Sequence, residues 1–409
     1  MTQPIDDPVA LQRGGAGHVA LMRNARLRGL RCLYCAMRYP ISVVHDGCPA
    51  CVARGVHVSL CADYLPSDGP NPSAYNLPYT QAMTLGEGNT PLLNMPGLAE
   101  LSGVVELKIK DESRNPTGSH KDRMSAFGLS QALECGAHTV VLASSGNAGV
   151  SAAFYAKAAG LACEVATYEG MPSAYAAQLD ALGAKRFMFN DNAARWNFVK
   201  GRAALPGYFA LTNYHLPALG SAPLAIEGYK AIAYECEADG YVPDHVMVPT
   251  ARGDLAWGIY AGFADLLAAK QIKVLPKMWV VEPFARLTRV LAGQSLHASY
   301  AGSTEQFSTA GATVTYLQWQ AAQLSGGGAV VVTDAAAHAA RQVLTQHGMA
   351  PELCAAAGYS AVQALRANGR IASSSNVLCL LTANSSKDPS WSAANSAALA
   401  ASSLSPSFL

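Results

Sequence analysis

The sequence predicts an α/β fold with parallel sheets, and three observations support this prediction. From residue 84 onward, short apolar segments typical of buried strands alternate with Ala-rich segments typical of helices. This alternation favours parallel strands joined by crossover helices. The length of 409 residues, 50% of them hydrophobic and 14% charged, allows two or three domains around a large core.

Charge and hydropathy exclude several classes of function. The net charge of +1 gives no reason to expect nucleic acid or an anionic membrane as a partner. The sequence contains no apolar run of about 18 residues or more, so we expect no membrane-spanning helix. Residues 1–24 lack the apolar core of a secretory signal. We therefore expect a cytoplasmic protein.

Ten cysteines divide into a spaced group of four and six isolated residues. The spacing C-x2-C-x12-C-x2-C can bring four thiolates to one tetrahedral metal site. In the cytoplasm this favours zinc over two disulfides, and four thiolates leave no position open for substrate. The predicted ligands of this structural zinc are Cys32, Cys35, Cys48 and Cys51. Five isolated cysteines in apolar surroundings are expected to be core residues: Cys135, Cys163, Cys236, Cys354 and Cys379.

Composition suggests boundaries at both ends of the chain. Residues 1–61 form an N-terminal segment that contains the four-cysteine, ribbon-like pattern. Residues 62–83 are rich in Pro, Ser, Asn and Tyr and are expected to be a linker. Residues 390–409 are rich in Ser and Ala and are expected to be a loose tail.

A lysine stands at the start of a predicted helix. Residues 104–110 alternate as a strand does, and residues 115–118, N-P-T-G, have turn chemistry. Ser119 is the expected N-cap of the helix that follows. Lys121 would face the positive end of the helix dipole, which favours a neutral, nucleophilic amine. On its own, so short a motif is more often a solvated lysine on a surface turn.

Two further loops join a buried strand to a helix. Residues 144–149, S-S-G-N-A-G, follow the strand at 138–143, and amides at such a helix start can bind an anion. Residues 250–255, T-A-R-G-D-L, follow the strand at 245–249.

The segment N-P-T-G-S-H-K-D-R, residues 115–123, resembles the cofactor-lysine motif of the threonine synthases, which belong to the fold type II pyridoxal-phosphate (PLP) enzymes. Other segments that are similar to the family occur in its order between about residues 31 and 389. They are L-G-E-G-N-T-P-L (85–92), S-S-G-N (144–147), G-Y-K-A-I-A-Y-E (228–235), S-G-G-G-A-V-V-V-T-D (325–334), P-E-L-C-A-A (351–356) and T-A-N-S-S-K-D-P (382–389).

The resemblance implies two open parallel-sheet α/β domains. The large, PLP-binding domain would comprise residues 84–127 and 226–389, and the small domain residues 128–225. Similar four-cysteine ribbons precede the catalytic region in one branch of the family. A homodimer is also implied.

The resemblance also implies the roles of single residues. Lys121 would hold the PLP aldehyde and act on the proton at Cα of an amino-acid substrate. Asn147 would bond the cofactor 3-hydroxyl, and Thr382 the pyridine nitrogen. The substrate carboxylate would bind to Ser144, Ser145, Gly146 and Asn147. The cofactor phosphate would bind to Thr250, Ala251, Arg252, Gly253, Asp254 and Leu255. A carboxylate about 4 Å from a phosphate charge would cost roughly 4 kcal/mol at an effective dielectric of about 20, so Asp254 must point away from that phosphate or pair with Arg252.

The implied reaction is conversion of O-phosphohomoserine to threonine and phosphate by elimination and then water addition. Three departures from the family pattern bear on it. Ala225 replaces an Arg that grips the substrate phosphate, Ala148 replaces a hydroxyl residue, and His120 replaces Phe. They leave open a PLP-dependent ammonia-lyase or a β-replacement enzyme for a β-substituted or hydroxy amino acid. A third hypothesis is a cofactor-binding or zinc-ribbon module without catalysis, which the complete lysine motif disfavours.

Overall fold

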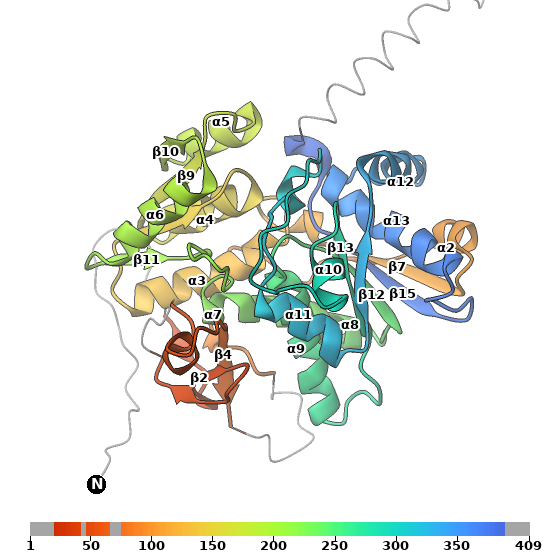
Figure 1. Ribbon diagram of the computed structural model, residues 1–409, viewed down its shortest axis with the longest axis horizontal. Coiled ribbons are helices and arrows are strands. Elements are labelled where there is room, and N and C mark those ends of the chain that lie inside the picture. Colours follow the sequence, from red (N-terminus) through yellow and green to blue (C-terminus); the bar gives the residue numbers. More distant parts are fainter. Residues whose placement is uncertain (1–19, 42–45, 66–74, 389–409) are drawn as a thin grey trace, which may run out of the picture.

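The structure is a computed structural model that describes residues 20–41, 46–65 and 75–388. The predicted loose tail, residues 390–409, lies outside these ranges. Figure 1 shows the elements of two sheets on opposite sides of the molecule, with a small N-terminal ribbon beneath α7. Among the described residues, no helix is both long and apolar enough to cross a membrane.

The larger sheet has six strands in the order β14-β13-β12-β15-β7-β6. All neighbouring pairs are parallel except β6 with β7 at the edge. Its central strands are buried on both faces, which explains their continuous apolar runs. The strands are β6 (Leu92–Asn94), β7 (Glu106–Asp111), β12 (His245–Pro249), β13 (Lys277–Glu282), β14 (Gly328–Val331) and β15 (Asn376–Leu381).

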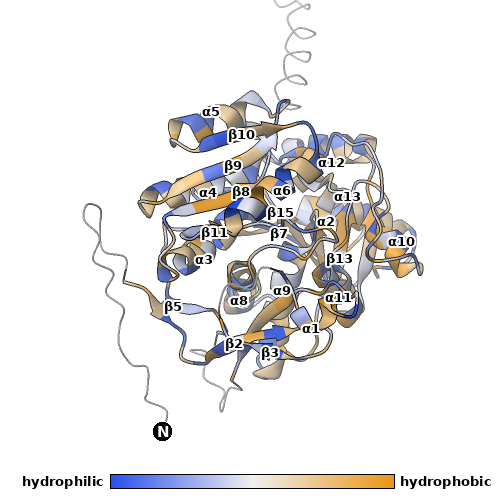
Figure 2. Cartoon of the chain, turned by 60° about the vertical axis from the view of Figure 1, so that its left-hand side comes forward, coloured by the Kyte–Doolittle hydropathy of each residue, from blue (hydrophilic) through white to orange (hydrophobic). Residues whose placement is uncertain are grey.

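The smaller sheet has four parallel strands in the order β10-β9-β8-β11. Its most buried strand is β8, which Figure 2 shows among the strongly hydrophobic parts of the chain. The strands are β8 (Thr139–Ala143), β9 (Ala162–Tyr168), β10 (Lys185–Phe189) and β11 (Tyr208–Ala210). The predicted parallel α/β architecture is thus confirmed.

Helices connect the parallel strands and cover the sheets. One apolar core lies between the sheets and α3, α4, α8 and α9, and a second lies between the large sheet, α2, α12 and α13. The helices are α2 (Pro96–Ser102), α3 (Lys121–Glu134), α4 (Asn147–Ala158), α5 (Ser173–Ala181), α6 (Asn192–Ala203), α7 (Pro223–Ile226), α8 (Lys230–Ala238), α9 (Asp254–Ala268), α10 (Leu287–Leu291), α11 (Tyr316–Leu324), α12 (Asp334–Gln346) and α13 (Leu353–Ala367).

The N-terminal ribbon is a three-stranded sheet, β3-β2-β4, with the short helix α1 (Pro49–Val52). Its strands are β2 (Leu27–Cys32), β3 (Arg38–Tyr39) and β4 (Leu60–Tyr64). The boundary expected at residue 61 is therefore too early, because β4 pairs with β2 as far as Tyr64. Residues 62–83 are also not linker throughout, since β5 (Tyr79–Gln81) pairs with β1 (Met22–Arg23).

A buried ion cluster fixes the start of α3. The Arg123 side chain donates to Glu112 Oε2 and to Glu235 Oε1, each at 2.6 Å, and is only 2% exposed. Lys110 Nζ lies 2.8 Å from Glu235 Oε2. Burial raises the pKa of Glu235, but the charge and hydrogen bonds of Arg123 and Lys110 outweigh it and lower that pKa to about 2. Strand β7, helix α3 and helix α8 are thereby joined through charged groups in the core.

Removing Arg123 should destabilise the fold strongly. Arg123→Met would leave the buried Glu112 carboxylate without its guanidinium, which costs about 3–5 kcal/mol. Chemical denaturation followed by circular dichroism would measure the loss. The matched control is Arg186→Met, which breaks the more exposed pair with Asp180 and should change stability by less than about 1 kcal/mol. Equal effects of the two changes would contradict the structural role of Arg123.

Candidate functional site

The carboxyl ends of two neighbouring strands of the larger sheet lie at the lysine turn. Strand β15 ends beside β7, with Leu381 opposite Asp111. The next residue, Thr382, is buried, and its carbonyl accepts from the backbone N–H of His120 at 2.9 Å. Ligands of open α/β sheets bind outside such strand ends. The sequence-predicted Lys121 and Thr382 therefore lie at one place in the fold.

The helix that carries Lys121 begins without the expected serine cap. Its N-cap is His120, which makes no side-chain cap bond, and the buried Ser119 hydroxyl has no hydrogen-bond partner. Ser119 instead forms an antiparallel bridge with Ala383, which fixes its backbone against the strand that follows β15. The Asp122 carboxylate accepts from the Thr117 N–H and hydroxyl, both at 2.6 Å, and so closes the turn.

Lys121 lies in a half-buried position with one hydrogen-bonding neighbour. Its Nζ is 3.5 Å from the Tyr229 hydroxyl. Burial lowers the pKa of Lys121; the Arg252 charge lowers it further, while Asp254 and Glu352 oppose the shift. The direction agrees with the sequence-based prediction, but desolvation is the main cause in place of the helix dipole. The shift favours the neutral amine more than in a free lysine, which is the direction that nucleophilic chemistry requires.

The buried His120 next to it is neutral. Burial and the charge of Lys121 hold the His120 pKa well below its usual value. Its Nδ1 lies 3.0 Å from the Thr382 carbonyl oxygen, which can only accept. Nδ1 therefore carries the proton, and Nε2 is left as an acceptor. His120, at the position where Phe was expected, is thus an uncharged ring beside the Lys121 amine.

In the loop at residues 144–149, some polar groups hold the loop together and others are left for a ligand. Ser144 Oγ accepts from the N–H groups of Gly146 and Gly149 at 3.2 and 2.9 Å, so this hydroxyl holds the loop together. Ser145 is half-buried. Asn147 donates through Nδ2 to Glu352 Oε2 at 2.8 Å, and its buried Oδ1 has no hydrogen-bond partner.

Glu352 is a site residue that sequence reasoning did not single out. It is 1% exposed at the start of α13 and bonds Asn147, and it also accepts from the Ser308 hydroxyl. Its partners are 205 and 44 residues away in sequence, so no local pattern reveals the contact. The only sequence signal was its place in the family-like P-E-L-C-A-A segment. Glu352 positions the Asn147 amide and adds negative charge near Lys121.

Some polar groups of the loop at residues 250–255 already have hydrogen-bond partners within the protein. The Gly253 N–H donates to Thr250 Oγ1 at 3.2 Å, and the Ala251 carbonyl accepts from Arg286 at 3.2 Å. Gly253 has φ of 89°, and a Cβ there would lie 2.3 Å from Gln318 Cβ, so only glycine fits. The first helical bond of α9 is from Trp257 N to the Gly253 carbonyl. The N–H groups of Asp254 and Leu255 therefore have no acceptor within their own helix.

The charged residues of this loop do not pair directly. Asp254 accepts from the Ser221 hydroxyl at 2.6 Å and from its N–H at 3.4 Å, so its carboxylate is held toward Ser221. Arg252 has a buried Nε without a hydrogen-bond partner. Burial lowers the pKa of Arg252 to about 10; Asp254 opposes the shift, and Arg195 and Arg286 add to it. Arg252 is thus still a cation at neutral pH.

A groove of about 540 Å³ opens beside the lysine turn. Residues 115–118 line it on one side, and Asn384 and Ser386 follow β15 on the same side. Side chains of α4 and α5, including Phe154 and Gln178, line the other side. Lys121 is not among the lining residues, so the groove adjoins the turn without containing the amine.

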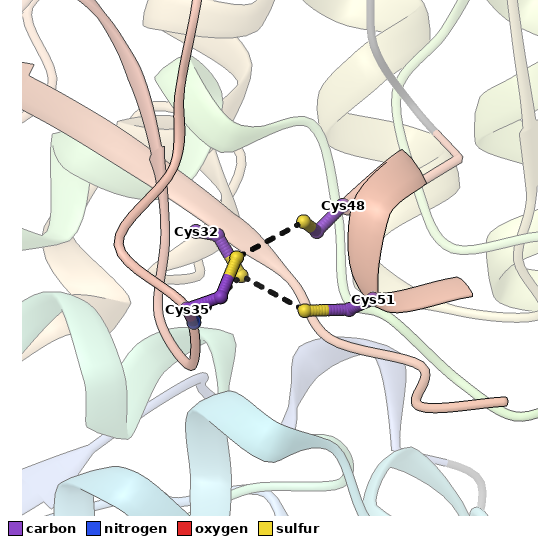
Figure 3. Close-up of side chains that lie close together, drawn as sticks. All are labelled: Cys32, Cys35, Cys48 and Cys51. Atoms are coloured by element: carbon purple, nitrogen blue, oxygen red, sulfur yellow. Dashed lines mark hydrogen bonds between the residues drawn. The ribbon is translucent and has the colours of Figure 1, made fainter. Parts of the chain in front are cut away.

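The four spaced cysteines converge in the ribbon, as predicted. Their sulfur atoms all lie within 4.8 Å of one another, with Cys32 to Cys51 at 3.7 Å and Cys35 to Cys48 at 3.6 Å (Figure 3). Four sulfurs at about 2.3 Å from one metal ion would be about 3.8 Å apart. A disulfide needs sulfurs only about 2 Å apart, which excludes one here. Burial raises the pKa of Cys48, but hydrogen bonds from Tyr39 and neighbouring groups outweigh it and lower that pKa to about 7.

The five cysteines expected in the core are not all there. Four are buried, but Cys135 is exposed. It is the C-cap of α3, and a helix end meets solvent more readily than the middle of an apolar face.

Comparison with known proteins gives one family match over most of the chain. The family described as pyridoxal-phosphate dependent enzyme matches residues 83–383. A threonine synthase from Halalkalibacterium halodurans is 32% identical over 315 residues, which is 76% of this chain and 86% of the relative. A threonine synthase from Methanosarcina acetivorans is 29% identical over 383 residues, 88% of this chain and 92% of the relative.

Solved structures share the fold. A fungal L-serine ammonia-lyase from Rhizomucor miehei superposes with a TM-score of 0.64 at 19% identity, covering 77% of this chain and 98% of the other. Maize serine racemase gives a TM-score of 0.63 at 19% identity, covering 76% and 93%. At such identity the likeness establishes the architecture alone.

Neutralising Glu352 should lower the pKa of Lys121 further. In Glu352→Gln the amine loses a nearby negative charge that favours its protonated form. The measurement is the pH dependence of Lys121 labelling by an amine-reactive reagent, followed by mass spectrometry. The midpoint should move to lower pH. The control is Glu305→Gln, an exposed carboxylate paired with His338. A midpoint that stays in place, or rises, would refute the role of Glu352.

Proposed function

The chain belongs to the pyridoxal-phosphate dependent enzymes, and from this premise we propose that it is a lyase acting on an amino acid, with Lys121 as the residue that holds the coenzyme. The family match covers residues 83–383, and both reported sequence relatives are threonine synthases. The single observation that carries the proposal is the half-buried Lys121 amine of lowered pKa at the converging strand ends.

The residues around Lys121 suit pyridoxal phosphate. Asn147 Oδ1 and Arg252 Nε are buried without partners, so both have unused hydrogen-bonding capacity. The N–H groups that begin α9 suit a phosphate, with Arg252 adding charge. Within the predicted phosphate loop, the amide of Gly253 and the carbonyl of Ala251 are already engaged. We therefore assign the phosphate mainly to the amides of Asp254 and Leu255 and to the Arg252 side chain.

The mechanism assigns a distinct task to each residue. Pyridoxal phosphate supplies an electron sink for the bond broken at Cα. Lys121 Nζ, whose pKa is lowered by burial, would hold the coenzyme through its aldehyde. Once the substrate amine had replaced it there, the freed Lys121 amine would take up and return the proton at the substrate Cα. Asn147, held by Glu352, would bond the coenzyme hydroxyl. Thr382 would offer the pyridine nitrogen a neutral hydroxyl, which would leave that nitrogen largely unprotonated.

The substrate carboxylate is assigned to the loop at residues 144–147. Ser145 and the first amides of α4 are the groups best suited to it, because Ser144 Oγ is bonded within the loop. Gly146 lets the backbone pass closely under the rings of Phe307 and Tyr175, where a Cβ would meet Phe307 at 3.3 Å. Asn147 thus has two proposed partners, the coenzyme and the substrate.

For the reaction, we favour a threonine synthase-like conversion of O-phosphohomoserine to threonine and phosphate. The relatives at 32% and 29% identity support it. A specific observation favours the alternative, an ammonia-lyase or β-replacement enzyme. Ala225 is fully buried where α7 packs on α3, and a Cβ on Gly128 would approach Ala225 Cβ to 3.2 Å. An arginine at position 225 would not fit, so another residue must bind the substrate phosphate.

Replacing Lys121 should abolish retention of the coenzyme. Lys121→Ala removes the only amine that the proposal gives to the PLP aldehyde. The visible absorbance of bound PLP, present in wild type after gel filtration, should be lost. The control Lys185→Ala changes an exposed lysine on β10 and should keep the absorbance. A variant at Lys121 that still carries the chromophore through the column would refute the assignment.

The same preparations separate the two reactions. With O-phosphohomoserine, release of phosphate with threonine supports the first, and ammonia with a keto acid supports the second. L-serine and L-threonine as substrates give a further test of the alternative. No turnover of any of these amino acids by PLP-loaded wild type would favour the non-catalytic module.

We propose that the four cysteines hold one structural zinc ion, that the enzyme is a homodimer, and that it works in the cytoplasm. The spacing of the four sulfur atoms supports zinc, and none of the ten cysteines is in a disulfide, which suits a reducing compartment. Native mass spectrometry should find one zinc per chain and two chains per particle. Cys48→Ser should lose the metal and lower the melting temperature, whereas Cys135→Ser should do neither. Metal retained by the Cys48 variant would contradict the site.

A further inference from the structure

We propose that Arg195 and Arg252 form a binding site for a phosphate-like oxyanion where α6 approaches the loop that precedes α9. Arg195 comes from α6 of the small domain, and Arg252 comes from the loop that precedes α9 of the large domain. The inference rests on the proposed function, because the oxyanion belongs either to the coenzyme or to an acidic substituent of the substrate. Sequence reasoning gave Arg195 no role.

Both guanidinium groups lie against aromatic rings of the small domain. The Arg195 Cζ is 3.9 Å from the centre of the Tyr168 ring, and Tyr168 ends strand β9. The Arg252 Cζ is 4.9 Å from the ring centre of Trp196, the residue after Arg195. Stacking fixes the plane of a guanidinium while leaving its edge N–H groups for an anion. The two arginines therefore lie near each other, although they belong to different domains.

Among the described residues, neither arginine forms an ion pair with a carboxylate, which is the partner that a buried cation normally has. Arg195 is only 6% exposed, and its Nε has no hydrogen-bond partner; Arg252 Nε is also buried without one. Burying an unpaired cation is costly, and a bound anion offsets that cost. Arg202, two turns further along α6, shows the usual arrangement, with Glu164 at 3.0 Å. Arg195 and Arg252 therefore differ from Arg202, which has a carboxylate partner.

A third arginine supports the loop and adds to the positive field. Arg286 is fully buried, lies 3.4 Å from Glu282, and donates to the Ala251 carbonyl. It therefore fixes the backbone that carries Arg252. The nearby Asp254 is bonded to Ser221 and does not form an ion pair with Arg252 among the described residues. Positive charge around Arg252 is thus incompletely balanced by the chain itself.

The site faces the proposed reaction centre. The Arg252 charge acts on Lys121, which places the two side chains in one electrostatic environment. Tyr168 and Thr250 both follow or end strands at the carboxyl edges of their sheets, where open α/β folds bind ligands. A planar guanidinium binds a tetrahedral oxyanion through two parallel hydrogen bonds. Two neighbouring guanidinium groups therefore suit a phosphate group better than a single carboxylate.

Two sources of the oxyanion remain and can be distinguished. A coenzyme phosphate would lie at the start of α9, next to Arg252. A substrate substituent would lie further toward the small domain, next to Arg195, and would replace the grip that Ala225 cannot supply. The test uses Arg195→Gln, the charge-retaining Arg195→Lys, and Arg202→Gln as the matched control on the same helix.

Three dissociation constants are measured for each variant and for wild type: those of inorganic phosphate, PLP and pyridoxal. Inorganic phosphate is titrated calorimetrically into the loaded enzyme, and PLP and pyridoxal are each titrated into protein stripped of coenzyme. If the substrate is the source, Arg195→Gln should weaken phosphate binding about tenfold or more and leave PLP affinity unchanged. If the coenzyme is the source, PLP affinity should fall by that factor while pyridoxal affinity stays the same. Arg195→Lys should recover part of either loss.

The proposal is overturned if Arg195→Gln and Arg202→Gln have the same affinity for inorganic phosphate and the same affinity for PLP. Equal melting temperatures of the two variants would exclude misfolding as the cause of a difference. The outcome is separable from that of the proposed function. A wild-type chain that binds no PLP would refute the latter, whereas phosphate titrated into that protein would still report on the two arginines.

Discussion

The buried ion cluster around Arg123 is the constraint on which the rest of the structure depends. It joins β7, α3 and α8 through contacts of 2.6 to 2.8 Å that are largely shielded from water. Breaking one partner of such a cluster leaves a charge without compensation, so its geometry is strongly held. Lys121 is two residues before Arg123 on the same helical turn. The position of the amine is therefore fixed by charges that take no part in the chemistry, and the Asp122 carboxylate closes the turn from the other side.

Cations in this protein fall into two groups, and the difference is informative. Arg123, Lys110 and Lys230 are buried with carboxylates at hydrogen-bonding distance, which serves the fold. Arg195 and Arg252 lie against aromatic rings and form no ion pair among the described residues, although each has a buried Nε. Because a buried cation without a carboxylate partner is costly, a bound anion would offset the most at these two arginines.

Sequence patterns predicted the parts of the site that are local. The strand, turn and helix around Lys121, the loops at 144–149 and 250–255, and the four-cysteine spacing all lie where expected. Long-range contacts were not predictable. Glu352 reaches Asn147 across 205 residues, and the Ser119 cap is absent because Ala383 bridges to its backbone. The Ser144 hydroxyl is bonded within its own loop, a choice that depends on backbone geometry and not on residue type.

The ribbon is physically connected to the lysine, although its cysteines are remote from it. Tyr64, at the end of β4, donates to Glu227 at 3.1 Å, and Lys230 pairs with both Glu227 at 2.6 Å and Asp265 at 3.0 Å. Tyr229 lies within this segment, and its hydroxyl is 3.5 Å from Lys121 Nζ. The segment at 227–230 is thus held by the Tyr64 hydroxyl of the ribbon and by the ion pairs of Lys230, and it presents one hydroxyl to the amine. A ribbon that loses its fold would remove the Tyr64 contact and leave Glu227 held by Lys230, which weakens the support of the segment that carries Tyr229.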